Sequence, residues 1–257
     1  QSAGVVEIYD ASGPSPVLIE RLESPNPSRG GSFGTSMDLD GDRLVVGQLS
    51  SEHSTAFVFE LSTTGTTLLT SLDSPDGISN GFGRSVAISG DRVLVGDFRK
   101  GSASLFDIGG SEPVLIDTLT DPDTGSNLFG WTAAMDGDLI TIGAFRSDTG
   151  TADLAGKTHV YRVVDEDAVL IETLTSPSPS IVNGYSSGLA VEGNRIVVGE
   201  PGRDLDPNAT NDNTGSVYVY EVVGNQVSLR QSIAQIESSY FGQSVDLSDG
   251  RLAVGAV

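Results

Sequence analysis

The chain has 257 residues, and its 35 Asp and Glu outnumber its 14 Lys and Arg, giving a formal net charge of −21. This charge argues against nucleic acid or an anionic membrane as a partner, and favours cation binding, a basic partner or simply a solvated acidic surface. The absence of cysteine excludes disulfides, thiolate metal sites and thiol catalysis, and no apolar run approaches the ~20 residues of a membrane-spanning helix.

The first predicted elements are two strands within residues 4–23, and a repeated hairpin follows them. In five copies an aromatic residue is followed fourteen positions later by glycine. The predicted hairpins that these anchors bound are residues 33–47, 82–96, 129–143, 185–199 and 241–255. Each contains two apolar alternations around a tight turn, as in FGRSVAISGDRVLVG from Phe82 to Gly96.

A second pair of strands accompanies each hairpin. The third strand of each unit ends in an aromatic residue, namely Tyr9, Phe59, Phe106, Tyr161 and Tyr220. In four of the five copies a proline sixteen positions later ends the fourth strand, namely Pro25, Pro75, Pro122 and Pro177. Because no segment shows helical periodicity, the sequence predicts an all-β protein.

Successive hairpins are separated by 49, 47, 56 and 56 residues. Four strands in a period of this length are typical of a β-propeller built from four-stranded antiparallel blades. We therefore predict one domain over residues 1–257, with five blades. The last blade would be closed by pairing the C-terminal hairpin with the strands of residues 4–23, which hides two strand edges. The alternatives are an arc of a larger propeller, or half-blades that pair between molecules.

The hairpin FGRSVAISGDRVLVG, followed by a polar loop and a strand such as GSVYVYE, resembles the FG-GAP repeats of integrin-α-type propellers and their bacterial secreted relatives. The resemblance covers nearly the whole chain, although the family more usually has seven blades. Its Gly-Ala-Pro element is poorly kept, with Gly199-Glu200-Pro201 and Gly255-Ala256 nearest to it. The resemblance implies an extracellular or cell-surface binding protein, often supported by calcium. The family's calcium loop lies inside the hairpin, where the turns of this chain are too short, so that position is not carried over.

The connections between the second and third strands differ most in length. Two of them, residues 144–156 and 200–214, are the longest. These connections emerge on the same side of a propeller as those between the fourth strand and the next hairpin. Because insertions on one face often mark a binding face, these two loops are the candidate ligand-binding loops, unless they have simply lengthened where packing permits.

The longer of these loops carries oxygen-bearing side chains at alternate positions. They are Asp204, Asp206, Asn208, Thr210 and Asp212. Alternate oxygens turned into a tight loop are the ligands that Ca²⁺ requires, so this set is the predicted calcium site. Ala209 stands where the turn usually needs glycine, and Gly215 where a bidentate glutamate is usual. A solvated acidic loop, Asx-turns and N-glycosylation at Asn208 remain alternatives. Asp148 and Asp153 form a looser set that we do not expect to bind metal.

Catalysis has weaker support, and no catalytic residue is predicted. The two histidines, His53 and His159, are too few for a site built from several histidines. Asp38 and Asp246 occupy equivalent positions and would be neighbours in a closed ring, as in glycosidases that use paired carboxylates. Alanine fills the other three equivalent positions. We therefore favour the interpretation that the two carboxylates are solvated by water in the axial channel and are not a catalytic pair. Trp131 and the loop aromatics are candidates for stacking on sugars, but Trp131 follows the Phe129-Gly130 anchor and is predicted to pack between blades.

The sequence therefore favours a secreted or cell-surface binding or adhesion module that recognises a protein or carbohydrate through one propeller face, with Ca²⁺ as the candidate cofactor. A structural subunit that self-associates through its terminal strands is the first alternative. An enzyme that acts on glycosides is the second.

Overall fold

The computed structural model describes residues 4–28, 30–63, 65–123, 127–150, 154–179, 184–202, 214–234 and 240–256. These residues form twenty strands and no helix, so none of them belongs to a helix that could span a bilayer. The strands make four four-stranded antiparallel sheets and two two-stranded sheets, each with neighbours in chain order. The all-β prediction is therefore confirmed.

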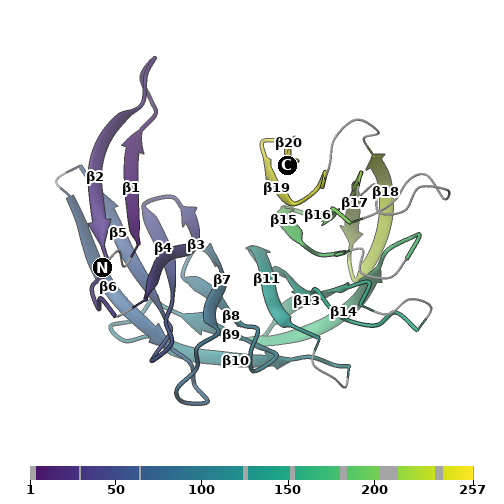
Figure 1. The fold of residues 1–257 in the computed structure, drawn as a ribbon, viewed down its shortest axis with the longest axis horizontal. Coiled ribbons are helices and arrows are strands. Elements are labelled where there is room, and N and C mark those ends of the chain that lie inside the picture. Colours follow the sequence, from purple (N-terminus) through teal and green to yellow (C-terminus); the bar gives the residue numbers. More distant parts are fainter. Residues whose placement is uncertain are drawn as a thin grey trace.

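The four complete sheets follow the predicted repeat. The first two contain β3 (Ser32–Asp40), β4 (Arg43–Leu49), β5 (Thr55–Ser62) and β6 (Gly65–Asp73), then β7 (Phe82–Ser89), β8 (Arg92–Asp97), β9 (Ser102–Asp107) and β10 (Val114–Thr120). The next two contain β11 (Phe129–Asp136), β12 (Leu139–Ala144), β13 (Lys157–Val164) and β14 (Asp167–Thr175), then β15 (Gly188–Glu192), β16 (Arg195–Glu200), β17 (Ser216–Val223) and β18 (Gln226–Ala234). The sheets stand side by side around an arc, with the first strand of each on the concave side (Figure 1).

The two remaining sheets are half-units at the ends of the arc. They are β1 (Val5–Asp10) with β2 (Val17–Glu23), and β19 (Ser244–Ser248) with β20 (Arg251–Gly255). The predicted closing blade is not formed in this structure, because these pairs are separate sheets and the arc is open between them (Figure 1).

The hairpin turns keep their length while their chemistry changes. In β3–β4, Asp40 pairs with Arg43 across a two-residue turn in which Gly41 has φ 60°. In β19–β20, Ser248 pairs with Arg251, and both Asp249 and Gly250 have positive φ. The first turn needs one left-handed residue and the last needs two, as expected for the two tight hairpin types. The one-residue shift of glycine in the last copy therefore leaves the register unchanged.

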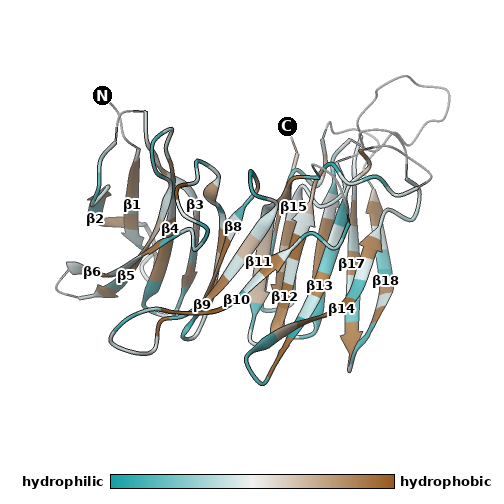
Figure 2. Ribbon diagram, turned by 90° about the horizontal axis from the view of Figure 1, so that it is seen from below, coloured by the Kyte–Doolittle hydropathy of each residue, from teal (hydrophilic) through white to brown (hydrophobic). Residues whose placement is uncertain are grey.

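Hydrophobic residues lie mainly in the strands, and hydrophilic residues lie in many of the connecting loops (Figure 2). The second strand of a unit is the most deeply buried, and every residue of β12 is buried. The aromatic anchors lie between neighbouring sheets, with Phe82, Phe129 and Tyr185 fully buried. Each sheet buries its apolar faces against its neighbours, as the meander of the repeat requires.

One hydrogen bond recurs between neighbouring units. The last side chain of each first strand accepts from the backbone N–H of the turn glycine in the next unit. The four pairs, acceptor first, are Asp40 with Gly90, Ser89 with Gly137, Asp136 with Gly193, and Glu192 with Gly250. Their lengths are 2.7, 2.9, 2.6 and 3.1 Å. The side chain changes from unit to unit, but an acceptor is always kept, so this bond helps to fix how one sheet sits against the next.

Buried tyrosines make the fold sensitive to alkali. Burial raises the pKa of Tyr220 to about 12 and, together with the neighbouring Tyr220, raises that of Tyr185 well above its usual value. The two hydroxyls are hydrogen-bonded at 2.7 Å. A raised pKa means that the folded state keeps a proton that the unfolded state releases. The stabilisation is therefore complete below pH ~10 and is lost as the pH rises towards the folded-state pKa.

We expect the thermal midpoint to fall steeply above pH ~10, with tyrosinate absorbance from these residues appearing only as the protein unfolds. Tyr9, which is 50% exposed, serves as an internal comparison because it ionises without unfolding. Complete tyrosine ionisation in a protein that keeps its native circular dichroism would contradict this prediction.

Candidate functional site

The predicted calcium residues 204, 206, 208, 210 and 212 lie within residues 203–213, outside the described part of the chain. The candidate loop of residues 144–156 is described except for residues 151–153. In it, Asp148 Oδ1 accepts a hydrogen bond of 2.8 Å from the backbone N–H of Leu154. The Asp148 side chain is therefore hydrogen-bonded within its own loop. Asp153 lies outside the described residues.

A β-bulge at the start of the first strand directs one side chain per unit towards the face of the candidate loops. In β7 the pairing passes from Phe82 directly to Ser85, and in β11 from Phe129 directly to Thr132. The glycines within these bulges have φ 81° and 83°. The residue that follows each glycine is not paired with the neighbouring strand. Bulges of this kind change the direction in which a side chain points, and they are common near binding sites. The two residues that follow the glycines are Arg84 and Trp131.

Aromatic rings and the Arg84 guanidinium form a cluster around Trp131, the only tryptophan of the chain. Arg84 Cζ lies 4.1 Å from the Trp131 ring centroid, within cation–π range. Phe145 stacks on Trp131 with centroids 5.7 Å apart and planes at 19°, and Phe98 meets it edge-on at 5.2 Å. Because Phe98 belongs to the preceding unit, Trp131 does pack between units as predicted, but it also faces solvent.

The cluster forms one side of a pocket of about 500 Å³. Its other lining residues include Ser187, Tyr240 and Gln243. Arg84, Trp131, Ser187 and Gln243 hold the same repeat position in successive units, directly after the second residue of the anchor. Among the described residues the pocket is lined by one guanidinium and no carboxylate. This is unusual in a chain with a net charge of −21.

The guanidinium of Arg84 is available to bind an anionic group. No described residue forms an ion pair with Arg84, and burial lowers the pKa of its guanidinium without bringing it near neutrality. Its ring contact with Trp131 orders the side chain and leaves the fork of N–H donors for a ligand. Sequence reasoning missed Arg84, and for Trp131 it preferred packing between blades to stacking on a sugar. The available signal was the residue after each aromatic–glycine pair.

A larger concavity of about 770 Å³ lies at the opposite ends of the first strands. It is lined by Asp38 and Asp246, although the closed ring in which they were expected to be neighbours is not formed, and also by Asp40, Asp136 and Glu192. Asp38 Oδ2 accepts a 2.8 Å bond from the N–H of Ile88 in the next unit. Burial raises the Asp38 pKa, with smaller contributions from Asp40 and Asp246. The Ile88 bond and those made by Asp40, Asp136 and Glu192 join neighbouring units, which gives most of these carboxylates a structural role.

The two histidines differ sharply in environment. His53 is exposed, and its Nε2 lies 2.9 Å from Asp73 Oδ1. His159 lies on β13 and is fully buried. Burial lowers the His159 pKa, against the opposing charges of Asp121 and Asp123, which favours a neutral imidazole at pH 7.

No family model matches the chain, and no curated protein matches it. Solved structures do share its fold. A protein from Lactobacillus plantarum superposes with a TM-score of 0.62 at 15% identity, over 98% of this chain and 69% of that one. A chain of a mitotic checkpoint complex superposes with a TM-score of 0.59 at 13% identity, over 99% of this chain and 66% of that one. At these identities the likeness shows the fold alone, and it defines an all-β, propeller-like protein.

Proposed function

We propose that this protein is a secreted or cell-surface binding module that recognises an anionic glycan through the pocket around Arg84 and Trp131. The observation that carries the proposal concerns the described residues of the pocket: the Arg84 guanidinium lies against the Trp131 ring, none of these residues forms an ion pair with it, and none of them is a carboxylate. A guanidinium binds carboxylate or sulfate groups through two parallel hydrogen bonds. Tyr240, which is 42% exposed, offers a ring surface for a sugar, while Ser187 and Gln243 offer partners for hydroxyl groups.

The position of the pocket agrees with this role. It lies on the face that carries the two candidate loops, and Phe145 and Pro201 of those loops line it. Its volume of about 500 Å³ is in the range of small-ligand sites. The resemblance to FG-GAP propellers supports an extracellular location and a role in binding or adhesion. Calcium at residues 204–212 belongs to the same proposal, because this loop continues from Pro201 and Gly202 beside the pocket. We propose no catalytic activity.

The test is a titration followed by the fluorescence of Trp131, whose signal needs no label because no other tryptophan is present. Uronic-acid oligosaccharides are added in low salt with chelator, beside neutral oligosaccharides of the same length. We expect saturable binding of the acidic series alone. Arg84→Gln should weaken it about tenfold or more, as expected for the loss of a charge-assisted hydrogen bond.

The matched control is Arg21→Gln, which removes the same charge from an exposed residue on β2. It should leave binding unchanged. Equal weakening by both substitutions would indicate a general charge effect and contradict a specific site. Binding of an acidic peptide instead of the sugars, with the same Arg84 dependence, would assign the pocket to a protein partner.

A further inference from the structure

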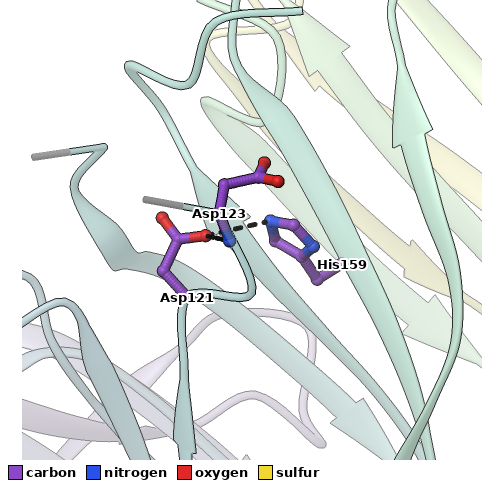
Figure 3. A group of neighbouring side chains, drawn as sticks. All are labelled: Asp121, Asp123 and His159. Atoms are coloured by element: carbon purple, nitrogen blue, oxygen red, sulfur yellow. Dashed lines mark hydrogen bonds and ion pairs between the residues drawn. The ribbon is translucent and has the colours of Figure 1, made fainter. Parts of the chain in front are cut away.

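A second cluster of polar side chains lies where two neighbouring sheets meet. Asp121 and Asp123 follow β10, and His159 projects from β13 of the next sheet. One carboxylate oxygen of each aspartate and one imidazole nitrogen all lie within 4.8 Å of one another. His159 Nε2 is 3.9 Å from Asp121 Oδ1. Figure 3 shows the imidazole facing the two aspartates, which come from the opposite side.

The imidazole of His159 is held in place while one of its nitrogens makes no hydrogen bond to any described residue. His159 is fully buried. Its Nδ1 lies 3.1 Å from Thr173 Oγ1, and its ring packs against Phe129 with centroids 5.5 Å apart. Nε2 is buried and has no hydrogen-bond partner in the part of the chain that the structure describes. When Nδ1–H donates to Thr173, Nε2 presents its lone pair towards the aspartates, which is the orientation of a metal-binding histidine.

This junction departs from the pattern of the other units. At two other junctions, a serine stands directly before the proline that ends the fourth strand. Its hydroxyl group is hydrogen-bonded to a polar side chain of the next unit, which stands directly after the anchor glycine of the second strand. The pairs are Ser24 with Gln48, and Ser74 with Asp97 at 3.5 Å. At the equivalent positions here stand Asp121 and Ala144. Asp121 therefore places a carboxylate at the position of the serine, and Ala144 places a methyl group at the position of its polar partner. Ala144 offers this carboxylate no side-chain hydrogen bond, so a cation could serve as a further partner.

We propose that Asp121, Asp123 and His159 bind a Zn²⁺ ion. Two carboxylate oxygens and one imidazole nitrogen give three protein ligands and leave a fourth tetrahedral position for water or an external ligand. Ligand bonds of about 2.0–2.2 Å require the three atoms to draw together slightly from their present separations. The imidazole selects against Ca²⁺ and Mg²⁺, which take oxygen ligands. Asp121 is already oriented, since its Oδ1 accepts from the Asp123 N–H at 2.9 Å and its Oδ2 from Asn127 at 3.0 Å.

The ammonium group of Lys157 would compete with the zinc ion for the carboxylate of Asp123. Lys157 Nζ forms an ion pair with Asp123 Oδ2, and the Lys157 side chain is only 15% exposed. Two carboxylates and one ammonium leave one negative charge near a neutral imidazole. A divalent cation reverses that charge, and it requires Asp123 to share or release Lys157. Removing the ammonium should therefore strengthen binding of the metal.

The experiment is calorimetric titration of metal-free protein with Zn²⁺ alone, and with Ca²⁺ and Mg²⁺ as separate ligands. We expect one zinc per chain. Asp123→Asn should weaken binding about tenfold or more, an effect within the range seen when groups around a metal site are changed. Lys157→Met should strengthen binding. His53→Gln removes the only other histidine and is the matched control, expected to bind zinc normally.

Since His159→Gln changes a fully buried position, ring-nitrogen NMR of the wild type keeps the test independent of folding. With two histidines in the chain, the His53→Gln spectrum assigns both. Zinc should shift the Nε2 signal of His159 and leave that of His53 unchanged. A zinc shift at His53 alone, or undiminished zinc binding by Asp123→Asn, would overturn the proposal. A calcium response of equal size that Asp123→Asn abolishes would overturn the choice of metal.

Discussion

Replacing Gly96 with alanine is expected to leave little folded protein, lowering the free energy of unfolding by about 4 kcal/mol or more. A Cβ atom at this position would lie 2.2 Å from the backbone oxygen of Gly130 in the next unit, and 2.3 Å from Ser85 Oγ. The serine can rotate, but the carbonyl belongs to the bulge that begins β11. The clash can be relieved only if the two sheets move apart. That movement exposes apolar surface that is buried between them.

Urea denaturation followed by circular dichroism measures this effect. Gly110→Ala is the matched control, because it lies in the same unit and the nearest atom to an added Cβ is Glu112 O at 3.5 Å. It should change the midpoint little. Similar midpoints for both variants would show that the sheets are not as closely apposed at Gly96 as the structure has them.

The second large effect is expected at the other anchor of the hairpin. Phe82→Ala should lower the free energy of unfolding by about 3–5 kcal/mol, because it deletes a buried ring and leaves a cavity. Phe82 is fully buried and meets Phe106 edge-on, with centroids 6.4 Å apart. It also belongs to a cluster that includes Val45 and Ala56 of the preceding unit. The ring thus fills the space between two sheets, and neither can collapse into the cavity alone.

Leu115→Ala is the control for this substitution, since Leu115 lies on β10 of the same unit and is 41% exposed. It should cost about 1 kcal/mol or less. Both variants should unfold with the wild-type slope against urea if only the stability of the native state has changed. A smaller loss for Phe82→Ala than for Leu115→Ala would contradict the role of the aromatic anchor.

Both anchors were predictable from spacing alone, for a physical reason. Phe82 and Gly96 are constrained by contacts that every unit makes with its neighbour, so the same residue types recur fourteen positions apart. Strand order, hairpin register and the all-β class follow from that recurrence. Ring closure does not follow, because it depends on how the sheets are oriented relative to one another, and the repeated residues do not specify that orientation. In the structure β1–β2 and β19–β20 remain separate sheets.

The candidate sites were predicted less well because they lie where the repeat changes. Arg84 and Trp131 differ from their equivalents Thr35 and Gln243, and a search for shared residues passes over such positions. His159 was judged alone because its partners come from the connection after β10, in another sheet. Comparing each unit with the others identifies both places, since Asp121 and Ala144 break a pattern that is kept at other junctions.

The open arc described here also determines how the molecule can come apart. Among the described residues, the main contacts between strands of different units join each unit to the unit before it and the unit after it, so stability is a sum along a row rather than a property of one shared core. The half-units are thinly buried: every residue of β19 and β20 is partly or fully exposed, whereas every residue of β12 is buried. For these 257 residues studied alone, unfolding should therefore begin at the half-units and move inward. The His159 cluster at the junction of the two central sheets would be among the last parts to open, and the surface of β1 and β2 among the first.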